Sequence, residues 1–436
     1  MYFFYSFCFT AGFLLALPYF LFQAMTQRKY FSTFFWRLGF LPKRFELLKE
    51  DGIWIHAVSV GEVMAILPLI ALLRSRWPSR QLWVSTTTVT GYSLATSKLA
   101  GNAEPFYFPL DWGFVVRRVL AKVRPAVVLV AETEIWPNFL HQCERRGIPV
   151  VLINGRLSDR SVRRYRRVRG FMTKVLSNFD YCCMQTDLDS ERLRLLGKTT
   201  NVEICGNLKY DIALPQGAET RWKEFRELLN LDTSSFVVVA GSTMKGEEVL
   251  VFEAFSALRA HVRATVLILA PRHPGRMPEI ETLLQEGGFQ YCRRSELGKS
   301  DHERRQSQEI VLLDTMGELA LVYGLGDLVF VGGSLVPTGG HNILEPALFR
   351  KPVLFGPHMN NFREIAEDFL KNGAAIRVNS ASDLGAKLIQ LYGDETLRLK
   401  MGETGHALMN EKRGAAKRIV RRLETVLSPE LCQQNS

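Results

Sequence analysis

The feature that most constrains the fold is an alternation of short apolar runs with longer amphipathic runs between residues 53 and 378. Such an alternation is typical of parallel βα units, in which each helix returns the chain to the same edge of a sheet. The predicted strands are 53–58, 82–87, 126–131, 149–154, 180–185 and 202–205 in the first half, and 236–240, 265–270, 288–292, 310–313, 328–331, 352–355 and 375–378 in the second. Each half therefore forms a complete doubly wound α/β unit.

The length of 436 residues also favours two domains over one continuous core. The polar stretch 208–222, which contains Pro215 and Gly217, is predicted as the linker between them. We expect a first Rossmann-like domain over residues 28–212 and a second over residues 213–436, which ends in amphipathic helices.

The N-terminal segment has a different composition. Residues 1–27 carry no charge, and the run from Phe3 to Ala24 is almost continuously apolar. A helix of this length can cross the hydrocarbon layer of a bilayer, which is about 30 Å thick. Basic residues follow at once, beginning with Arg28 and Lys29, and the positive-inside tendency then keeps the body of the protein in the cytoplasm. The segment predicts a single-pass membrane anchor, with a helix lying on the membrane or a buried helix as the alternatives.

Part of the net charge of +11 is concentrated in one short segment. Its basic residues are Arg160, Arg163, Arg164, Arg166, Arg167, Arg169 and Lys174. On a membrane-bound protein, such a segment suits anionic headgroups or lipid-borne phosphates, and the plain alternative is a solvated helix face. Because no recognised DNA or RNA motif accompanies these residues, nucleic acid is not expected as a partner.

A glycine-rich motif follows the predicted strand 328–331 and spans residues 339–347, Gly-Gly-His-Asn-Ile-Leu-Glu-Pro-Ala. A glycine-rich turn between a strand and a helix start leaves backbone N–H groups free to face an anion. Glu345 lies in the first turn of that helix and can accept hydrogen bonds from sugar hydroxyls, unless it is only a first-turn acid before Pro346. The motif predicts a nucleotide-sugar pocket at the carboxyl edge of the second sheet.

Two further strand ends of the second half are expected at the same edge. Arg272, in Ala-Pro-Arg-His-Pro, can clamp a phosphate because its guanidinium presents a fixed fork of donors. Gly317, in Asp-Thr-Met-Gly-Glu, lets the backbone approach a base or ribose closely. Glu318 of that motif also completes a capping box with Thr315, so a purely structural role stays open for it.

In the first half, a tight glycine turn carries the predicted strand 53–58 into a helix, and Glu62 lies at the start of that helix. A carboxylate at the carboxyl edge of a parallel sheet can act as a general base on an acceptor hydroxyl. The alternative is an acid that only complements the helix dipole, which would lower its pKa unless burial opposes the effect. His56, within the strand, is expected to be a hydrogen-bonded core histidine.

Three more charged groups end strands of the first half. Glu132 and Glu134 follow the predicted strand 126–131, and they either face the same edge as Glu62 or are solvated loop acids. Lys209 follows the last strand and can steady a developing negative charge or pair with Glu132.

Several chemical signatures are missing from the sequence. There is no P-loop, no G-x-G-x-x-G fingerprint, no metal-ligand cluster and no D-x-D motif. The seven cysteines form no C-x-x-C pair, which favours reduced thiols over disulfides or zinc. A transfer without metal or cofactor, in which protein groups neutralise the leaving phosphate, is the expectation that remains.

Several motifs in fixed order resemble those of the Kdo transferases (3-deoxy-D-manno-octulosonic acid transferases, lipid A-specific) of Gram-negative bacteria. They are H-A-V-S-V-G-E, A-E-T-E-I-W-P-N, I-N-G-R-L-S, G-N-L-K-Y-D, A-P-R-H-P, D-T-M-G-E-L and F-V-G-G-S-L-V-P-T-G-G-H-N-I-L-E-P-A. The resemblance covers nearly the whole chain, including its apolar N-terminus. One departure is Gly275, where the family usually has Glu, and this puts a role for that position in doubt.

The resemblance implies an inverting GT-B glycosyltransferase whose two Rossmann-like domains face a cleft. It would move Kdo from CMP-Kdo to a lipid A precursor, lipid IVA, at the cytoplasmic face of the inner membrane, in lipopolysaccharide biosynthesis. By motif match, Glu62 would be the general base, and Glu132 and Lys209 would support the transition state. The same match assigns CMP binding to Pro271, Arg272, Met316, Gly317, Glu318, Asn342, Ile343, Leu344 and Glu345.

Two other functions stay open at this point. A GT-B nucleotide-sugar epimerase or hydrolase would consume its donor without an acceptor and would need no anchor. A membrane-tethered binding module would depend on the arginine segment and not on Glu62.

Overall fold

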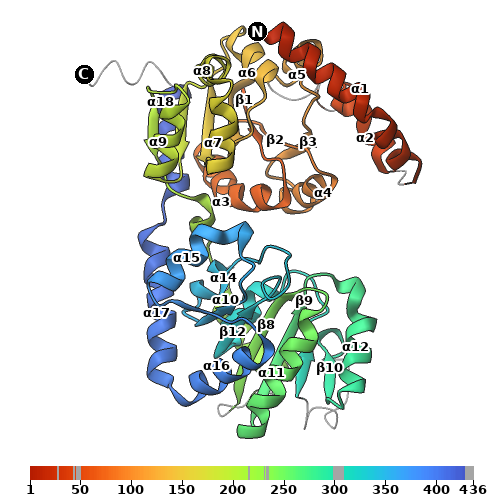
Figure 1. Cartoon of the computed structure of the whole chain (residues 1–436), viewed down its shortest axis with the longest axis vertical. Helices are drawn as coiled ribbons and strands as arrows, with labels where there is room; N and C mark the ends of the chain where they lie inside the picture. The colour runs from red at the N-terminus through yellow and green to blue at the C-terminus, as the bar shows by residue number, and fades with distance from the viewer. Residues whose placement is uncertain are drawn as a thin grey trace. The chain divides into compact units, whose positions relative to one another are not determined.

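The fold is described from a computed structural model of the chain (Figure 1). The structure describes residues 1–26, 29–42, 45, 51–214, 217–229, 231, 235–297 and 309–427, without the side chains of 19–26, 29–32 and 219. The chain divides into two compact units, which are Met1–Asp211 with Lys412–Ser436, and Ile212–Glu411. Within the described residues, each unit contains one sheet of seven strands, and every strand pair in both sheets is parallel.

The first sheet reverses its strand order between β1 and β4, which lie side by side. Across the sheet the strands are β3 (Glu104–Tyr107), β2 (Leu82–Thr86), β1 (Gly52–His56), β4 (Pro125–Ala131), β5 (Val150–Gly155), β6 (Tyr181–Met184) and β7 (Val202–Ile204). In open parallel sheets, ligands bind beyond the carboxyl ends of the strands at such a reversal point. The site expected in the first unit therefore lies just beyond His56 and Ala131.

Helices cover both faces of this sheet, so its central strands are buried throughout and their sequences are continuously apolar. Ile55 and Leu129 point to the face covered by α3 and α18, while Trp54 and Val128 point to the face covered by α5, α6 and α8. The helices of the unit are α1 (Tyr2–Thr26), α2 (Lys29–Arg37), α3 (Val60–Arg76), α4 (Val89–Lys98), α5 (Gly113–Val123), α6 (Pro137–Glu144), α7 (Asp159–Arg166), α8 (Arg169–Leu176), α9 (Asp187–Leu195), the 3₁₀ helix η2 (Leu208–Asp211) and α18 (Ala415–Leu427).

The second sheet reverses its order between β8 and β12. Across the sheet the strands are β10 (Tyr291–Arg293), β11 (Ile310–Leu312), β9 (Thr265–Pro271), β8 (Phe236–Thr243), β12 (Leu328–Val331), β13 (Val353–Phe355) and β14 (Ala375–Arg377). Its helices are α10 (Ala218–Leu228), α11 (Glu247–His261), η3 (Pro274–Arg276), α12 (Met277–Glu286), η4 (Arg294–Glu296), α13 (Leu319–Val322), η6 (Tyr323–Leu325), α14 (Leu344–Leu348), η7 (Asn360–Phe362), α15 (Arg363–Lys371), α16 (Ala381–Gly393) and α17 (Glu395–Glu411). The side chains of α11, α12 and α16 fill the core on one face of this sheet.

The predicted strands are confirmed, but the pattern missed β3. This strand has four residues, lies at the edge of the first sheet and contains Pro105. Proline donates no ladder hydrogen bond and is tolerated at a sheet edge, so a short edge strand with a proline lacks the usual strand signal.

The C-terminal residues belong to the first unit, whereas the sequence analysis placed all of 213–436 in the second. Helix α18 buries Ile419 and Leu423 in the core beside α3. The carboxylate of Asp211, the last residue before the second unit, accepts hydrogen bonds from the N–H groups of Gly414 and Ala416, both at 2.6 Å. Amphipathic periodicity predicts that α18 has an apolar face, but not which unit that face covers.

Within the part of the chain that the structure describes, no helix is both long enough and apolar enough to cross a membrane. The structure therefore does not support the spanning anchor expected over residues 1–27. The side chains of residues 19–26 and the whole of residue 27 lie outside the described part of that segment.

Candidate active site

The loop after β1 places Glu62 in the first turn of α3. Ser59 is the N-cap of this helix, and its hydroxyl accepts a hydrogen bond from the Glu62 N–H at 3.5 Å. The Glu62 carboxylate in turn accepts hydrogen bonds from the Val58 N–H at 2.8 Å and from the Ser59 hydroxyl at 3.0 Å. This reciprocal arrangement is a variant of the capping box, and it leaves Glu62 only 8% exposed at the carboxyl edge of the sheet.

Burial raises the pKa of Glu62 from 4.5 to about 7, and the nearby charge of Glu132 adds to the increase. The hydrogen bonds from Val58 and Ser59 act in the opposite direction but do not compensate. Of the two effects weighed for this residue, desolvation therefore outweighs the stabilisation of its charge at the helix start. A carboxylate with a pKa near neutrality is suited to accept a proton from a hydroxyl group.

Glu132 directly follows β4, the neighbour of β1 at the reversal point. Its backbone lies in the left-handed region, with φ of +56°, and its N–H donates to the Ile153 carbonyl at 2.9 Å. A non-glycine residue in this region is uncommon and costs about 1–3 kcal/mol, and such residues concentrate at functional sites. The Glu134 carboxylate accepts a hydrogen bond from the indole of Trp136 at 3.1 Å, and burial raises its pKa. The structure thus brings Glu62 and Glu132 within electrostatic reach at one edge of the sheet.

Lys209 lies in η2, which packs against α3. A network of buried amides holds this segment in place. Asn154, which is also left-handed with φ of +53°, accepts a hydrogen bond from the Leu208 N–H at 2.9 Å. Asn207 accepts one from the Lys209 N–H at 2.9 Å and donates to the side chain of Gln185 at 2.9 Å. The sequence analysis did not single out these amides, although two of them lie in motifs that it quoted.

His56 is a core residue, as expected. Its ring is fully buried and stacks on Phe108 with 3.8 Å between ring centroids, and Nδ1 lies 3.0 Å from the Ser85 hydroxyl. Burial lowers the pKa of His56 to about 3, so the ring stays neutral at physiological pH.

In the second unit, the reversal point is organised by Glu247, which the sequence analysis did not identify. This residue begins α11 and is fully buried. Its carboxylate accepts four backbone N–H groups, from Met244 at 2.9 Å, Gly333 at 2.6 Å, Ser334 at 2.8 Å and Leu335 at 2.7 Å. Sequence shows an acid after Gly246, but it does not show that the glycine-rich loop after β12 folds around that acid.

The N–H groups just upstream of the predicted motif 339–347, together with that of Gly340 inside it, already have acceptors within the protein. The N–H groups of Gly333, Ser334 and Leu335 bind Glu247, and that of Gly340 donates to the Gly333 carbonyl at 2.7 Å. Gly332 is required for another reason, since a Cβ there would lie 2.6 Å from the Thr243 Cα. The ends of β8 and β12 therefore touch, which leaves room for glycine only.

Downstream, the motif gathers polar groups around Tyr323. The Tyr323 hydroxyl lies near Ser242 and within electrostatic range of Glu345 and Arg272. The Glu345 carboxylate accepts a hydrogen bond from the Asn342 amide at 3.2 Å, which orients it. Burial raises the pKa of Tyr323 well above its usual value, so its hydroxyl stays protonated.

The remaining residues predicted to bind the nucleotide differ in the groups that they can present to a ligand. Ile343 and Leu344 are fully buried, so they can contact a ligand only through their backbone. Pro271 is buried at the end of β9, and the Arg272 side chain that follows it is exposed and forms no ion pair within the described chain. Next to it, burial and the charge of Arg272 lower the pKa of His341 to about 4.

The loop after β11 presents Met316, Gly317 and Glu318. Met316 is 81% exposed, and Gly317 has φ of +84° with open space where a Cβ would be. The Glu318 carboxylate accepts hydrogen bonds from the Thr315 hydroxyl and from Arg294 at 3.2 Å. Glu318 therefore shapes its own loop, while Met316 and Gly317 are open to a ligand.

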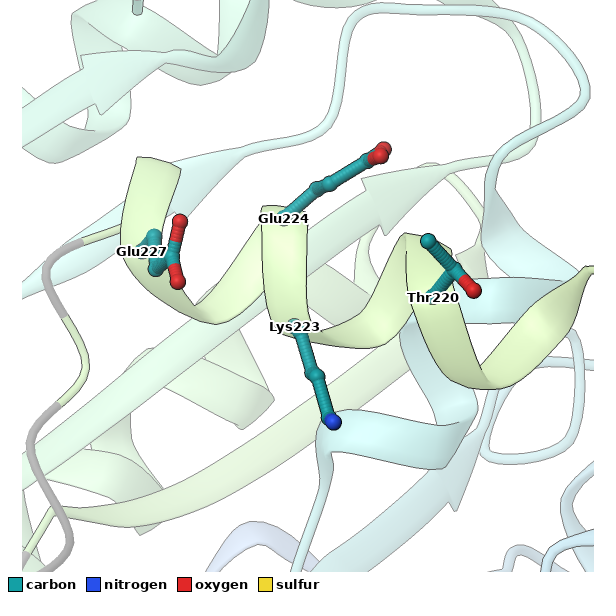
Figure 2. A pocket seen from close by; sticks show the side chains of 4 residues that line it. All are labelled: Thr220, Lys223, Glu224 and Glu227. Atoms are coloured by element: carbon teal, nitrogen blue, oxygen red, sulfur yellow. The ribbon is translucent and has the colours of Figure 1, made fainter.

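A hollow of about 270 Å³ lies elsewhere in the second unit, along α10. It is lined by Thr220, Lys223, Glu224 and Glu227. Figure 2 shows that these side chains point in different directions, with Lys223 directed away from Glu224, so no polar groups converge there. Among the residues that the structure describes, no three His, Cys, Asp or Glu side chains are grouped as metal ligands.

Comparison with known proteins connects these sites to a family. The family described as 3-deoxy-D-manno-octulosonic-acid transferase (kdotransferase) has a sequence model that matches residues 32–212. The 3-deoxy-D-manno-octulosonic acid transferase of Haemophilus influenzae is 35% identical over 379 residues, which are 86% of this chain and 87% of that protein. The transferase of the same description from Bordetella pertussis is 33% identical over 386 residues, 85% of this chain and 86% of that protein.

The solved structures extend the comparison to the fold. The UDP-GlcNAc 2-epimerase from Neisseria meningitidis bound to UDP-GlcNAc superposes with a TM-score of 0.56 at 15% identity, covering 85% of this chain and 99% of that one. At this identity the likeness concerns the fold alone, which is a GT-B-like α/β fold with two parallel sheets.

Proposed function

Because the chain belongs to the family of 3-deoxy-D-manno-octulosonic acid (Kdo) transferases, glycosyltransferases of lipopolysaccharide biosynthesis, we propose that it transfers Kdo from CMP-Kdo to a lipid A precursor, lipid IVA. The transfer inverts the anomeric carbon and uses no metal ion. The observation that carries this proposal is Glu62, a buried carboxylate at the reversal point of the first sheet with a pKa raised to about 7.

In the proposed step, a primary hydroxyl of the acceptor gives its proton to Glu62. The hydroxyl oxygen bonds to the anomeric carbon of Kdo while the bond from that carbon to the CMP phosphate breaks on the opposite face, which inverts the centre. The charge of Glu132 supports the step because it keeps the pKa of Glu62 high enough for Glu62 to be an effective base. Lys209, held by its amide network, is assigned to the negative charge that develops in the transition state.

The second unit is assigned to the donor. Arg272 suits the CMP phosphate because it is exposed at a strand end and forms no ion pair within the described chain. Met316 and Gly317 are assigned to the donor with Glu318 holding their loop, and the segment from Asn342 to Glu345 is assigned to the donor as well. Glu345 and Arg272 both lie near Tyr323, which supports a single site for the phosphate and the sugar. The sequence has no D-x-D motif, and this favours neutralisation of the leaving phosphate by protein groups.

We further propose that the enzyme works at the cytoplasmic face of the inner membrane, where its lipid acceptor resides. The apolar N-terminal run and the arginine segment support this location. In α7, only Val162 is buried, so the arginines of that helix line its exposed side. Such a face suits lipid-borne phosphates.

The test is to incubate detergent-solubilised protein with CMP-Kdo and tetraacylated lipid IVA, and to weigh the lipid product by mass spectrometry. A mass gain of one or more Kdo units, retained in EDTA, is the expected result. Release of CMP without lipid modification would favour the hydrolase alternative. No turnover of either compound by folded protein would reject the transferase proposal and favour the binding module, for which Arg163→Glu and Arg164→Glu should abolish function while Glu62 is dispensable.

A further inference from the structure

The first turns of α1 are built into the first unit through polar side chains. The Tyr2 hydroxyl accepts a hydrogen bond from Asn178 at 3.0 Å, and Ser6 bonds to the side chain of Asn138 at 3.0 Å. The Thr10 hydroxyl accepts one from the indole of Trp112 at 3.0 Å. Tyr5, Ser6 and Thr10 follow Tyr2 at helical spacing, so these groups line one face of the helix.

The same face carries aromatic and charged contacts. Tyr2 stacks on His141 with 4.1 Å between ring centroids, and Phe13 meets Trp112 edge-on at 4.9 Å. Tyr5 lies within electrostatic range of Asp111, a fully buried carboxylate that accepts the N–H groups of Asn138 and Phe139. Over the residues from Tyr2 to Phe13, the helix therefore packs on α6, α8 and Trp112, the residue before α5, and it cannot leave without exposing these groups.

The opposite face of α1 is bare, apolar and highly exposed. Its residues, which we call the bare face, are Phe3 (87% exposed), Phe4 (70%), Phe7 (64%), Leu14 (58%) and Leu15 (84%). Other exposed aromatic side chains of the first unit are Phe34, Phe35, Phe40 and Phe114. A monomeric soluble surface rarely concentrates large apolar side chains in this way, so the bare face requires a partner.

A helix held in this manner is too short to span a bilayer. Helix α1 ends at Thr26, so 13 residues (14 to 26) follow Phe13, whose ring contact with Trp112 is the furthest along α1 among the described side chains. Crossing the hydrocarbon layer takes about 20 residues. The bare face can instead enter a membrane sideways, as the apolar face of a helix that lies in the interface does.

Basic groups of the same unit support an anionic membrane as the partner. Helix α5, whose N-cap residue Trp112 contacts α1, contains Arg117, Arg118 and Lys122 and no acidic residue. The Arg118 guanidinium lies 4.4 Å from the ring centroid of the exposed Phe40. At the other end, the Lys174 ammonium lies 5.9 Å from the ring centroid of Tyr2. Aromatic side chains flanked by basic groups match the boundary between acyl chains and anionic headgroups.

We infer that α1 lies flat in the membrane interface as a docked part of the first unit, with its bare face in the acyl-chain region of an anionic bilayer. The inference rests on the proposed membrane location and adds the orientation of the helix. It assigns the apolar N-terminal run to an in-plane helix and not to a spanning anchor.

The first test measures binding of the full chain to vesicles by flotation. Wild-type protein is expected to float with vesicles of phosphatidylglycerol and phosphatidylethanolamine and to float poorly with phosphatidylcholine alone. The double variant Phe7→Glu/Leu15→Glu should lose at least about tenfold in binding with an unchanged melting temperature, because both side chains are exposed. Leu399→Glu is the matched control, since Leu399 is 61% exposed in the second unit, and it should bind like wild type. If the double variant instead changes only the oligomeric state, a second copy of the chain covers the bare face and the inference is overturned.

The second test separates an in-plane helix from a spanning one. Cys8, which is exposed, is labelled with bimane in a Cys432→Ser background, and position 15 is labelled in Leu15→Cys/Cys8→Ser/Cys432→Ser. Quenching by lipids brominated at different depths should place both labels equally deep. A spanning helix would separate them by about 10 Å, since seven residues rise about 1.5 Å each, and that result would overturn the inference. Transfer to lipid IVA in detergent micelles is measured on the same variants, so a failed orientation is distinguishable from a failed transferase.

Discussion

Each unit buries a glutamate in the first turn of the helix that follows its first strand, Glu62 after β1 and Glu247 after β8. The Glu62 carboxylate accepts two hydrogen bonds, one on each oxygen, and stays 8% exposed. The Glu247 carboxylate accepts four backbone N–H groups, two on each oxygen, and has no exposed surface. Both residues lie at the point where the strand order of their sheet reverses.

The difference shows that the number of hydrogen-bond donors, and not the position in the fold, decides whether a buried carboxylate holds a loop or stays available to a ligand. Hydrogen bonds to the charged form compensate for its burial, and four donors use all the lone-pair sites of a carboxylate. Glu247 is thus committed to holding the loop after β12. Glu62 keeps unused acceptor capacity and lies near a second negative charge, so it can gain and lose a proton near neutral pH.

The largest effect is expected for Glu62→Gln, which tests the role assigned to this carboxylate. We expect kcat to fall about 10²- to 10⁴-fold because the amide cannot take the acceptor proton, while the affinity for CMP-Kdo stays unchanged. Steady-state kinetics and calorimetric donor binding measure the two effects. Glu134→Gln is the control at the same sheet edge, since Glu134 is held by Trp136, and its loss of kcat should be far smaller. Full turnover by Glu62→Gln would exclude the assigned role.

The second largest effect is expected for Glu247→Ala. The substitution leaves buried N–H groups without an acceptor and should lower the free energy of unfolding of the second unit by at least about 3 kcal/mol. Chemical denaturation followed by fluorescence measures the loss, and calorimetry should show weaker CMP binding. Glu62→Ala serves as the comparison. If both alanine variants destabilise equally, the two carboxylates do not differ in the way that their donors indicate.

The next effect concerns the strand β9, which has an arginine near each end. Arg272→Ala should weaken CMP binding about 10- to 100-fold, because it removes charge-assisted hydrogen bonds to the phosphate. Arg263, at the amino end of β9, is also exposed, and Arg263→Ala should bind CMP like wild type. Equal losses for both variants would point to general electrostatic attraction and not to a phosphate clamp.

The smallest expected effect is a shift of the pH profile of the reaction. As a base, Glu62 must be ionised, so kcat/KM should rise with pH through its pKa of about 7. Glu132→Gln removes the charge that raises this pKa, and it should move the acidic limb of the profile to lower pH by up to about one unit. A limb that stays in place would mean that burial alone sets the pKa.

The same raised pKa also affects stability. Between pH 4.5 and about 7, the folded state retains the Glu62 proton that the unfolded state has lost, so this residue destabilises the fold progressively as the pH rises through that interval. In Glu62→Gln this component of the pH dependence should disappear, which thermal unfolding at pH 5 and pH 8 can measure.

Much of the fold follows from the sequence because each buried parallel strand is a continuous apolar run. The exceptions are informative. Pro105 conceals the edge strand β3, and β8 continues to Thr243 although Gly241 and Ser242 resemble the start of a loop. The period of α18 predicts an apolar face but not that this face covers the core of the first unit.

The site is less predictable than the fold. Sequence places Glu62 and Glu132 at strand ends, but it shows neither that β1 and β4 are neighbours nor that Glu132 is left-handed and electrostatically coupled to Glu62. The pKa of Glu62 depends on a balance between burial and hydrogen bonds that spacing does not contain. Glu247 was missed because its partners Gly333 and Ser334 are more than eighty residues away in the chain.

Helix α18 belongs to the first unit although it follows the second unit in the chain, and this order has a consequence for folding during translation. The second unit is one uninterrupted stretch of chain, Ile212–Glu411, and its sheet can close as soon as that stretch has left the ribosome. The first unit must wait, because Ile419 and Leu423 complete its core and Asp211 binds the start of α18. The part that is translated first is therefore the part that matures last, so a released chain truncated before residue 415 would have a complete second unit and a first unit whose core is still open to water.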